Sequence, residues 1–348
     1  MDSASLIVPS MGSNGLGRAY SLWLVLRAMG WNVQVVGQGG GRVWAPLAES
    51  SFAEVCRAVG SENEIAQVVR AYSPSVVISV KPRMATVARA IASQLDVPHI
   101  VDLDDEHLNA QARYRRRLGL VGVKTYREGW RPWREERLRS LIRRSTVTVS
   151  NPVLREAWGG TVIPHCREIR RVGGAHTRSV PVVCFAGTNR AHKGVDVLRD
   201  ACEEIGRQGG CSLEIVGFED APRGCWETLR PVQPLEQTLD RVAACDIVAI
   251  PSMDGAFARS QLPVKLIDAM LLKRSVISTD LPVLRWATGG HAAFVRPGST
   301  TDLVAAIERL SDPRRRSVQS EALYQHADRL YRPESLVARF AGVIAAAR

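Results

Sequence analysis

Two lysines in this 348-residue sequence stand where a positive charge could hold a phosphate group. Lys193 lies in FAGTNRAHKGVDVL, residues 185–198, and Lys265 lies in LPVKLIDAM, residues 262–270; each segment leads from a turn into a helical pattern. The chain has 41 arginines and only 5 lysines, so a lysine is the less expected cation. Its ammonium suits phosphate as a point charge, and a helix start adds backbone N–H groups. With Arg190 in the first segment, these residues predict an anion site.

A carboxylate follows the second lysine at helical spacing. Lys265 and Asp268 are three residues apart, so they share one face near the start of a helix that Pro263 would open. This face would pair a cation for a diphosphate with a carboxylate for a ribose diol. A surface ion pair at the same spacing is the alternative, and the spacing by itself does not decide between them.

A glycine-rich turn follows the first strand-like run, in PSMGSNGLGRAY, residues 9–20. Gly12, Gly15 and Gly17 would let the backbone approach a ligand at the start of a helix. Their order is not the dinucleotide fingerprint G-x-G-x-x-G, and the sequence contains no Walker A motif. A nicotinamide dehydrogenase is therefore not favoured, and a tight turn that merely needs glycine is an equal alternative.

Acidic residues gather in VDLDDEH, residues 101–107, where another strand should end. Asp102, Asp104, Asp105 and His107 could bind a metal or supply a general base. The alternative is that one aspartate caps the following helix and the others face water. The position favours a site role, and we do not predict a metal.

The elements that must position these residues are short apolar strands alternating with helices. The predicted strands are residues 6–9, 33–37, 75–80, 99–103, 146–150, 182–187, 213–217, 246–252 and 275–279. This alternation predicts two doubly wound parallel sheets, in which ligands lie at the carboxyl ends of the strands. Residues 164–180 lack apolar periodicity and should divide the two domains.

Composition excludes several classes of protein. Apolar residues make up 45% and charged residues 23%, which excludes a disordered, collagen-like or coiled-coil chain. No run of eighteen apolar residues and no secretory signal are present, so we expect a cytoplasmic protein. The seven cysteines contain no C-x-x-C pair and are expected to be buried thiols.

The net charge of +11 is concentrated in one segment. Residues 113–144 carry twelve basic and three acidic side chains, so that this window alone contributes +9. It could attract nucleic acid, anionic lipid or an anionic substrate, but a solvated, mostly helical face is the favoured interpretation. No zinc-finger, RNP or helix-turn-helix signature accompanies it, and we predict no nucleic-acid partner.

The ordered set of motifs resembles a known family. AGTNRAHKG, LEIVG, AACDIVAIPS, LPVKLIDAM, SVIST and HAAFVRPGSTTDLVAAIERL occur in this order in the second half, with looser matches in PSVVISVKPRM, VPHIVDLDDEH and TVTVSNPVLREAWGG. In these motifs the chain resembles the retaining, nucleotide-sugar-dependent glycosyltransferases of GT-B fold, of the family-4 type (glycosyl transferases group 1). The resemblance extends over nearly the whole chain.

The resemblance implies a fold and an activity. Two Rossmann-like domains would face a cleft: residues 1–168, with a helix in 330–348 packing back, and residues 178–329, which would bind the nucleotide sugar. The expected catalytic residues are Lys193, Lys265, Arg190 and His107. The expected donor-binding residues are Gly15, Gly17, Gly187, Thr188, Asp268, Val264 and Leu266.

Two departures from the family pattern concern the donor sugar. The family usually has two acidic residues eight positions apart; here Asp268 takes the second place and Ser260 the first. An altered sugar, a different contact from Arg259 or Gln261, or lost activity would each account for Ser260. Thr188 stands where an arginine is usual, and Arg190 would substitute for it.

The reaction implied is transfer of a sugar from a UDP- or GDP-sugar to a small-molecule acceptor. In a retaining enzyme the departing diphosphate oxygen can take the acceptor's proton, so the protein supplies cations and a helix N-terminus to the leaving group. We therefore expect no cofactor and no metal. The expected pathway is bacterial specialised-metabolite (antibiotic) biosynthesis. The alternatives are a cell-envelope glycan or glycolipid transferase, docked on the inner face of the membrane through residues 113–144, and an inactive nucleotide-sugar-binding homologue. The oligomeric state is left open.

Overall fold

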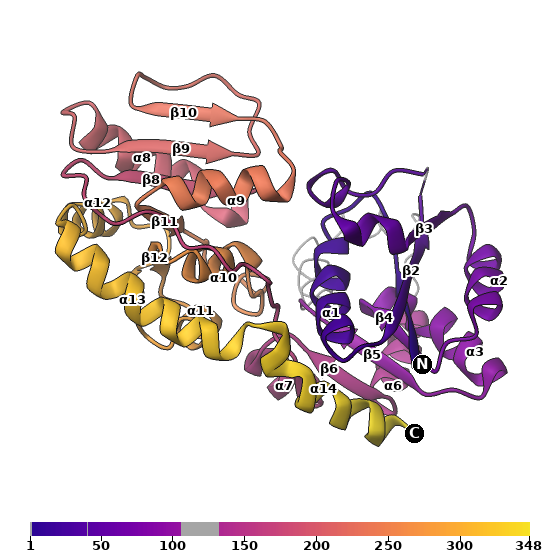
Figure 1. Ribbon diagram of the computed structural model, residues 1–348. Helices are drawn as coiled ribbons and strands as arrows, with labels where there is room; N and C mark the ends of the chain where they lie inside the picture. The colour runs from indigo at the N-terminus through magenta and orange to yellow at the C-terminus, as the bar shows by residue number, and fades with distance from the viewer. Residues whose placement is uncertain (1, 40, 106–131) are drawn as a thin grey trace. The chain divides into compact units, whose positions relative to one another are not determined.

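The computed structural model describes residues 2–39, 41–105 and 132–348, and the chain separates into two compact units. Unit 1 comprises residues 1–44, 51–164 and 336–348, and unit 2 comprises residues 45–50 and 165–335. Each unit is a parallel sheet covered by helices (Figure 1). The α/β class predicted from the sequence is confirmed.

Unit 1 is built on a sheet that has, within the described residues, seven strands in the order β3-β2-β1-β4-β5-β6-β7. All neighbouring strands are parallel. The strands are β1 Ser3–Val8, β2 Asn32–Gln38, β3 Cys56–Val59, β4 Val76–Val80, β5 His99–Leu103, β6 Thr146–Val149 and β7 Thr161–Val162. The central strands β1 and β4 are almost entirely buried, because helices lie on both faces of the sheet.

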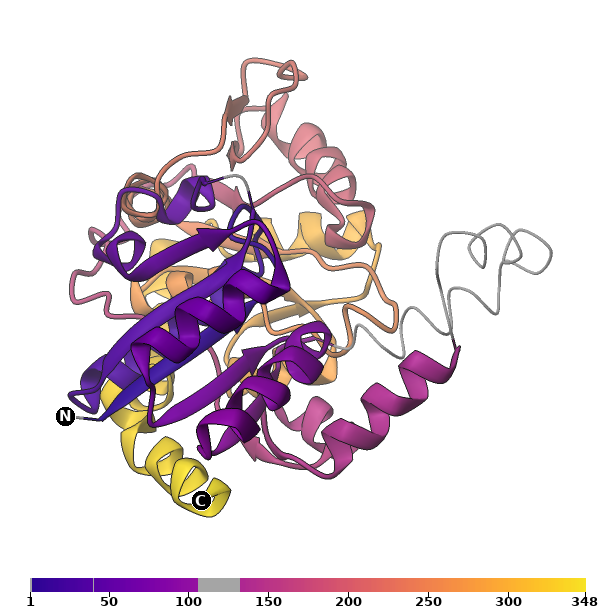
Figure 2. The ribbon, with the colours of Figure 1, turned by 90° about the vertical axis from the view of Figure 1, so that its right-hand side faces the viewer.

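Helices α2 and α3 cover one face of this sheet, and α1 covers the other (Figures 1 and 2). Ser61 caps α2 by accepting a hydrogen bond from the Glu64 amide, and Asn151 caps α7 in the same way. The helical elements with residues in this unit are α1 Leu16–Ala28, α2 Glu62–Tyr72, α3 Ala85–Leu95, α6 Pro132–Arg143, α7 Pro152–Trp158, α14 Pro333–Ala347, and the short 3₁₀ turns η2 Ser51–Val55 and η3 Pro82–Met84.

Unit 2 is built on a second parallel sheet, whose described strands follow the order β10-β9-β8-β11-β12-β13. They are β8 Val182–Ala186, β9 Ser212–Val216, β10 Glu227–Arg230, β11 Ile247–Ile250, β12 Ser275–Thr279 and β13 Ala293–Val295. The helical elements are η1 Ala45–Leu47, η5 Ala191–Lys193, α8 Val195–Gly206, α9 Leu235–Ala244, α10 Val264–Leu271, α11 Pro282–Ala287, α12 Thr300–Arg309 and α13 Pro313–Leu330.

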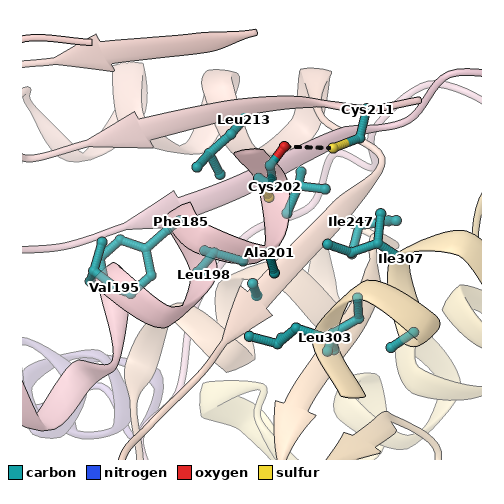
Figure 3. Packing of buried hydrophobic residues seen from close by; sticks show 14 of the residues in the cluster. Phe185, Val195, Leu198, Ala201, Cys202, Cys211, Leu213, Ile247, Leu303 and Ile307 are labelled. Atoms are coloured by element: carbon teal, nitrogen blue, oxygen red, sulfur yellow. Dashed lines mark hydrogen bonds between the residues drawn. The ribbon is translucent and has the colours of Figure 1, made fainter. Parts of the chain in front are cut away.

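The core of unit 2 joins the sheet to α8 and α12. Leu198 of α8, Leu213 of β9 and Ile307 of α12 are buried in one apolar cluster (Figure 3). Two of the cysteines expected to be buried lie in this cluster. Cys202 is fully buried, and the Cys211 thiol points to the backbone carbonyl of Cys202. Six cysteines are buried, whereas Cys225 is exposed, contrary to the expectation for all seven.

The segment expected to be a simple divider is attached to unit 2 along its length. Residues 163–181 form no helix or strand, but the Gly173 amide bonds to the Leu272 carbonyl and Arg274 donates to the Gly174 carbonyl. His176 and Arg178 both lie against Asp246, at 3.6 and 3.1 Å. The absence of periodicity therefore reflects an extended segment held by polar contacts.

Four short strands, β3, β7, β10 and β13, were not predicted. Each has two to four residues, and β3 and β10 lie at sheet edges with exposed positions. Strands β3 and β10 carry no continuous apolar run, because only part of their surface is covered.

Candidate functional site

The sharpest turn in unit 2 lies at the carboxyl end of β8. Gly187 has φ 141°, a region that side chains rarely adopt, and its amide donates to the Val216 carbonyl at 2.8 Å. Gly217 follows the adjacent strand, and a Cβ there would lie 2.8 Å from the Gly187 carbonyl oxygen. Only glycine fits at these two strand ends. The surface there is therefore formed by backbone atoms and not by side chains.

A second glycine sets the position of Lys193. Gly194, with φ 62°, is the residue before α8, and a Cβ on it would lie 1.9 Å from the Pro251 carbonyl oxygen. The turn η5 therefore packs closely on the loop after β11. Lys193 ends η5, and its Nζ donates to the Thr188 hydroxyl at 3.0 Å.

Lys265 reaches the same point from α10. Its Nζ lies 3.3 Å from the ring centroid of Phe185. A Cβ placed on Gly187 would lie 3.3 Å from the Lys193 Nζ and 3.7 Å from the Lys265 Nζ. Two lysine side chains that are 72 positions apart in the sequence thus bring their ammonium groups to one glycine.

Within the described part of the chain, no carboxylate neutralises this cluster: neither Lys193, Lys265 nor Arg190 forms an ion pair. Burial lowers the pKa of Lys193 to about 8, and the Arg190 guanidinium adds to the shift. Burial also lowers the pKa of Lys265 well below its usual value; the Lys193 ammonium lowers it further and the Cys184 thiol opposes this. Desolvated like charges that face each other are costly unless an anion lies between them.

The neighbouring His192 responds to the same cations. Burial lowers the pKa of its imidazole, and Lys193, Arg190 and Lys265 lower it further. The ring packs edge-on against Phe257, with centroids 5.1 Å apart. The sequence analysis did not single out His192 or Phe185, because neither carries a motif of its own.

Asp268 lies one helical turn beyond Lys265 and is almost fully buried. Its Oδ1 accepts a hydrogen bond from the Arg167 Nε at 2.9 Å. Burial raises the pKa of this carboxyl, the Arg167 guanidinium opposes the rise, and Glu236 on α9 adds to it. The ion pair that Asp268 forms is therefore with Arg167, and the alternative of a surface pair with Lys265 is wrong.

Two further predicted donor residues flank Lys265 on α10. Val264 is the first residue of the helix and is partly buried. The Leu266 side chain is fully buried, and its amide donates to the Pro263 carbonyl at 3.0 Å.

Ser260 stands where the family usually has a carboxylate that contacts the donor sugar. The Ser260 hydroxyl is buried and donates within its own turn, to the Ala256 and Phe257 carbonyls at 3.3 and 3.2 Å. Arg259 forms a two-point ion pair with Asp254 at 2.6 and 2.7 Å. Arg259 and Gln261 were the residues considered as replacements for this contact. The Arg259 guanidinium is already paired with Asp254.

In unit 1 the predicted glycine turn leads into α1. Gly15 precedes the helix, and a Cβ on it would lie 3.1 Å from the Lys81 Cε. Gly17 lies in the first turn, next to Trp44. Lys81 itself follows β4 with φ 76°, a left-handed conformation that is strained for a side chain. It is another lysine at a strand end, so the signal that identified Lys193 and Lys265 could have identified it.

The acidic residues after β5 are neutralised by cations within unit 1. Asp102 accepts from Arg18 at 2.8 and 2.7 Å and from the Thr148 hydroxyl at 2.7 Å. Lys81 Nζ lies 3.0 Å from Asp104 and 2.9 Å from Asp105.

Burial and the neighbouring Asp105 raise the pKa of Asp104 to about 6, against the lowering effect of Lys81. In the described ranges no three histidine, cysteine or acidic side chains are arranged to hold a metal ion.

One predicted catalytic residue cannot be placed. His107 lies outside the described residues, as does most of the basic window, residues 113–131. Of the helices that the structure does describe, none has the length and apolar character needed to cross a membrane.

Comparison with known proteins identifies several solved structures of similar fold. Among curated proteins, none matches this chain. The chain is similar in structure to sucrose-phosphate synthase from Thermosynechococcus elongatus, with a TM-score of 0.73, 15% identity and 99% of each chain covered. It is similar to Anabaena Alr3699/HepE in complex with UDP and glucose, with a TM-score of 0.73, 14% identity and 99% of each chain covered. An α-glucosyltransferase in complex with UDP-glucose and DNA containing an abasic site has a TM-score of 0.65 and 11% identity, with 99% of each chain covered.

These structures share the GT-B fold with this chain, so the predicted fold is confirmed. The family model described as glycosyl transferases group 1 matches residues 180–312, which hold Gly187, Lys193, Lys265 and Asp268. The resemblance drawn from the sequence is thereby confirmed, and the family match lies within unit 2.

Proposed function

We propose that this protein is a retaining glycosyltransferase that uses a nucleoside diphosphate sugar, with a UDP- or GDP-sugar as donor. The observation that carries the proposal is the convergence of the Lys193 and Lys265 ammonium groups at Gly187, without a carboxylate partner within the described residues. A diphosphate supplies the negative charge that this cluster lacks. The group 1 domain and the UDP named with HepE and the α-glucosyltransferase support this choice of ligand.

The same cations explain how the leaving group would be stabilised. As the bond from the sugar to the diphosphate breaks, negative charge grows on the phosphate oxygens, and two ammonium groups and the start of α8 are aimed at that charge. The phosphate oxygen that leaves accepts the acceptor's proton on the same face of the sugar, which retains its configuration. Because lysines neutralise the diphosphate, we propose that the reaction needs no divalent metal and no other cofactor.

Asp268 would bind the ribose of the donor. A buried carboxylate one turn beyond Lys265 can accept hydrogen bonds from a vicinal diol while Lys265 contacts the phosphates. Val264 and Leu266 flank Lys265 on α10, and the Lys265 ammonium reaches the turn that holds Gly187 and Thr188. For these four residues we propose contacts to the donor. For Gly15, Gly17 and His107 we propose roles toward the sugar and the acceptor.

The first experiment measures binding by thermal shift and calorimetry with UDP, GDP, ADP and dTDP, each with and without EDTA. We expect one nucleoside diphosphate to stabilise the protein equally well in EDTA, because binding to the native state raises the melting temperature by mass action. Stabilisation by none of the four contradicts the proposal. Stabilisation that EDTA abolishes and only a divalent cation restores contradicts the metal-independent part.

The second experiment measures turnover, because Ser260 favours one alternative. Its hydroxyl is directed into its own turn, so the carboxylate contact usual for the donor sugar is missing. Mass spectrometry of the protein with UDP- and GDP-sugars would detect hydrolysis or transfer, and the anomeric proton coupling of the product would report retention. Nucleotide binding without either reaction would identify an inactive nucleotide-sugar-binding homologue.

For the acceptor we propose a small molecule of a bacterial specialised-metabolite (antibiotic) pathway, with a cell-envelope glycan or glycolipid as the alternative. Co-sedimentation with vesicles of anionic lipid at low and high salt separates the two. Salt-sensitive binding supports peripheral contact at the membrane through residues 113–144, and no binding supports a cytoplasmic, soluble acceptor. Because the α-glucosyltransferase above was crystallised with DNA, a gel shift with duplex DNA tests the expectation of no nucleic-acid partner.

A further inference from the structure

A buried ion pair links the connecting segment of unit 2 to helix α10. The side chains of Arg167 and Asp268 are 5% and 10% exposed, and their Nε and Oδ1 are 2.9 Å apart. Neither the family model, which begins at residue 180, nor the motifs quoted for the resemblance includes Arg167. The pair therefore adds a residue to the site that sequence reasoning did not reach.

Arg167 is itself held in place on both sides. Its amide donates to the Tyr331 carbonyl at 3.0 Å, and its Nη1 donates to the Cys166 carbonyl at 3.1 Å. Tyr331 is fully buried, and its hydroxyl donates to the Ala287 carbonyl at 2.9 Å. A guanidinium with an anchored backbone holds a carboxylate in one orientation, which a flexible lysine would not do.

Asp268 retains hydrogen-bonding capacity beyond this contact. An ionised carboxylate can accept about four hydrogen bonds. Among the described residues, the side chain of Asp268 accepts one hydrogen bond, which the Arg167 Nε donates to Oδ1. Lys265 precedes Asp268 by three residues, about 4.5 Å of helical rise, so a phosphate at Lys265 places the attached pentose close to this carboxylate.

We propose that Arg167 is a positioning residue that orients the Asp268 carboxylate toward the ribose diol and so makes the site prefer ribonucleotides to 2′-deoxyribonucleotides. This inference rests on the proposed function, because it takes a nucleoside diphosphate as the ligand. Burial raises the pKa of Asp268 and the Arg167 guanidinium opposes this rise, while Oδ2 stays directed toward the sugar hydroxyls. A purely structural pair would stabilise unit 2 without affecting the choice between the two pentoses.

The test compares dissociation constants for UDP and 2′-deoxyuridine diphosphate, and for GDP and 2′-deoxyguanosine diphosphate, by calorimetry on the full chain. Loss of one hydrogen bond to a charged group should weaken binding about tenfold, so the wild type should prefer the ribonucleotide by about this factor. In R167Q the preference should fall to near one. In R167K, which keeps the positive charge but lacks the planar guanidinium, the preference for the ribonucleotide should be intermediate, at about threefold.

Arg170 provides a matched control in the same segment. It is 64% exposed and pairs with Glu334, so R170Q should leave the preference unchanged. An unchanged preference in both R167Q and R167K overturns the inference while leaving the proposed function intact. If R167Q does not fold, R167K decides alone: an intermediate preference supports the inference, and the wild-type preference overturns it. A wild type that binds none of these nucleotides overturns the proposed function and the inference with it.

Discussion

Both units place lysines at the carboxyl ends of their parallel strands, but the charges around these lysines differ. In unit 2, Lys193 and Lys265 meet at Gly187 and have no carboxylate beside them within the described residues. In unit 1, Lys81 lies at 3.0 and 2.9 Å from Asp104 and Asp105, and Arg18 pairs with Asp102. The same position in the same kind of fold is thus cationic in one unit and internally neutralised in the other.

This difference indicates which unit is prepared for an anion. The two aspartates raise the pKa of Lys81 although burial opposes them, whereas burial and like charges lower the pKa values of Lys193 and Lys265. In unit 1 the cations lie beside carboxylates of the same unit. In unit 2 no carboxylate among the described residues offsets the two lysines, an arrangement that is common where an anionic ligand supplies the opposite charge.

The largest expected effect is on nucleotide binding. K193M and K265M should each weaken binding of the preferred nucleoside diphosphate about thirtyfold, because each removes a charge-assisted contact to phosphate worth about 2 kcal/mol. Calorimetry would measure this. K273M is the matched control, since Lys273 pairs with Glu321 away from these strand ends. Equal affinity in K193M and K265M and the wild type would mean that the cluster is not the anion site.

Stability should respond in opposite directions in the two units. K81M leaves Asp104 and Asp105 buried without their cation and should destabilise the protein by about 2–3 kcal/mol. K265M removes a buried charge that has no carboxylate partner and should stabilise the ligand-free protein by about 1 kcal/mol. Urea unfolding followed by circular dichroism would compare the two variants. Destabilisation of similar size in K81M and K265M would show that the lysines of the two units do not differ in how their charges are compensated.

The pH dependence of binding should report Lys193. A diphosphate binds the protonated ammonium, whose pKa in the free protein is about 8, and binding raises that pKa. Affinity should therefore be nearly constant from pH 7 to 8 and fall up to about tenfold per pH unit above 8. The K193M variant should show a weaker dependence, because only Lys265 then remains to titrate. A wild-type affinity that stays constant up to pH 10 would contradict the lowered pKa.

The smallest expected effect is a pH dependence of stability in unit 1. Because the pKa of Asp104 is raised to about 6, the folded protein keeps a proton between about pH 4 and 6 that the unfolded chain releases. This carboxyl therefore stabilises the fold at acid pH, and its contribution should decrease as the pH rises through this window. The difference in unfolding free energy between the wild type and D104N, measured across the window, isolates it. If the wild type instead becomes more stable relative to D104N as the pH rises, then the attraction of Lys81 outweighs burial and lowers the pKa of Asp104.

Much of the fold followed from local pattern. The nine predicted strands correspond to β1, β2, β4, β5, β6, β8, β9, β11 and β12, because a parallel strand that is buried on both faces is rich in apolar residues. Edge strands such as β3 and β10 escaped prediction because part of their surface stays exposed. The connecting segment was recognised by its lack of periodicity, but its hydrogen bonds to Ala244, Leu272 and Arg274 join residues that are 66 to 100 positions apart.

The candidate site was predictable wherever one residue type was unusual for its place. Lys193 and Lys265 stand out in an arginine-rich chain, and Gly187 and Gly194 stand at turns that tolerate no side chain. The partners of Asp268 and Asp102 were not predictable. Arg167 and Arg18 are two of 41 arginines, and nothing in the sequence around them marks them as buried.

The sequence alone determined the alternation of strands and helices, the two parallel sheets and the lysines at the strand ends, because these depend on periodicity and residue type within short windows. Only the tertiary structure decided which charges meet. Lys193 and Lys265 come together without a carboxylate in the described chain, whereas Lys81 and Arg18 are neutralised by aspartates. The physical reason is that the electrostatic state of a side chain depends on its burial and on neighbours within a few ångströms, and in a parallel sheet those neighbours come from strands and helices far apart in the sequence.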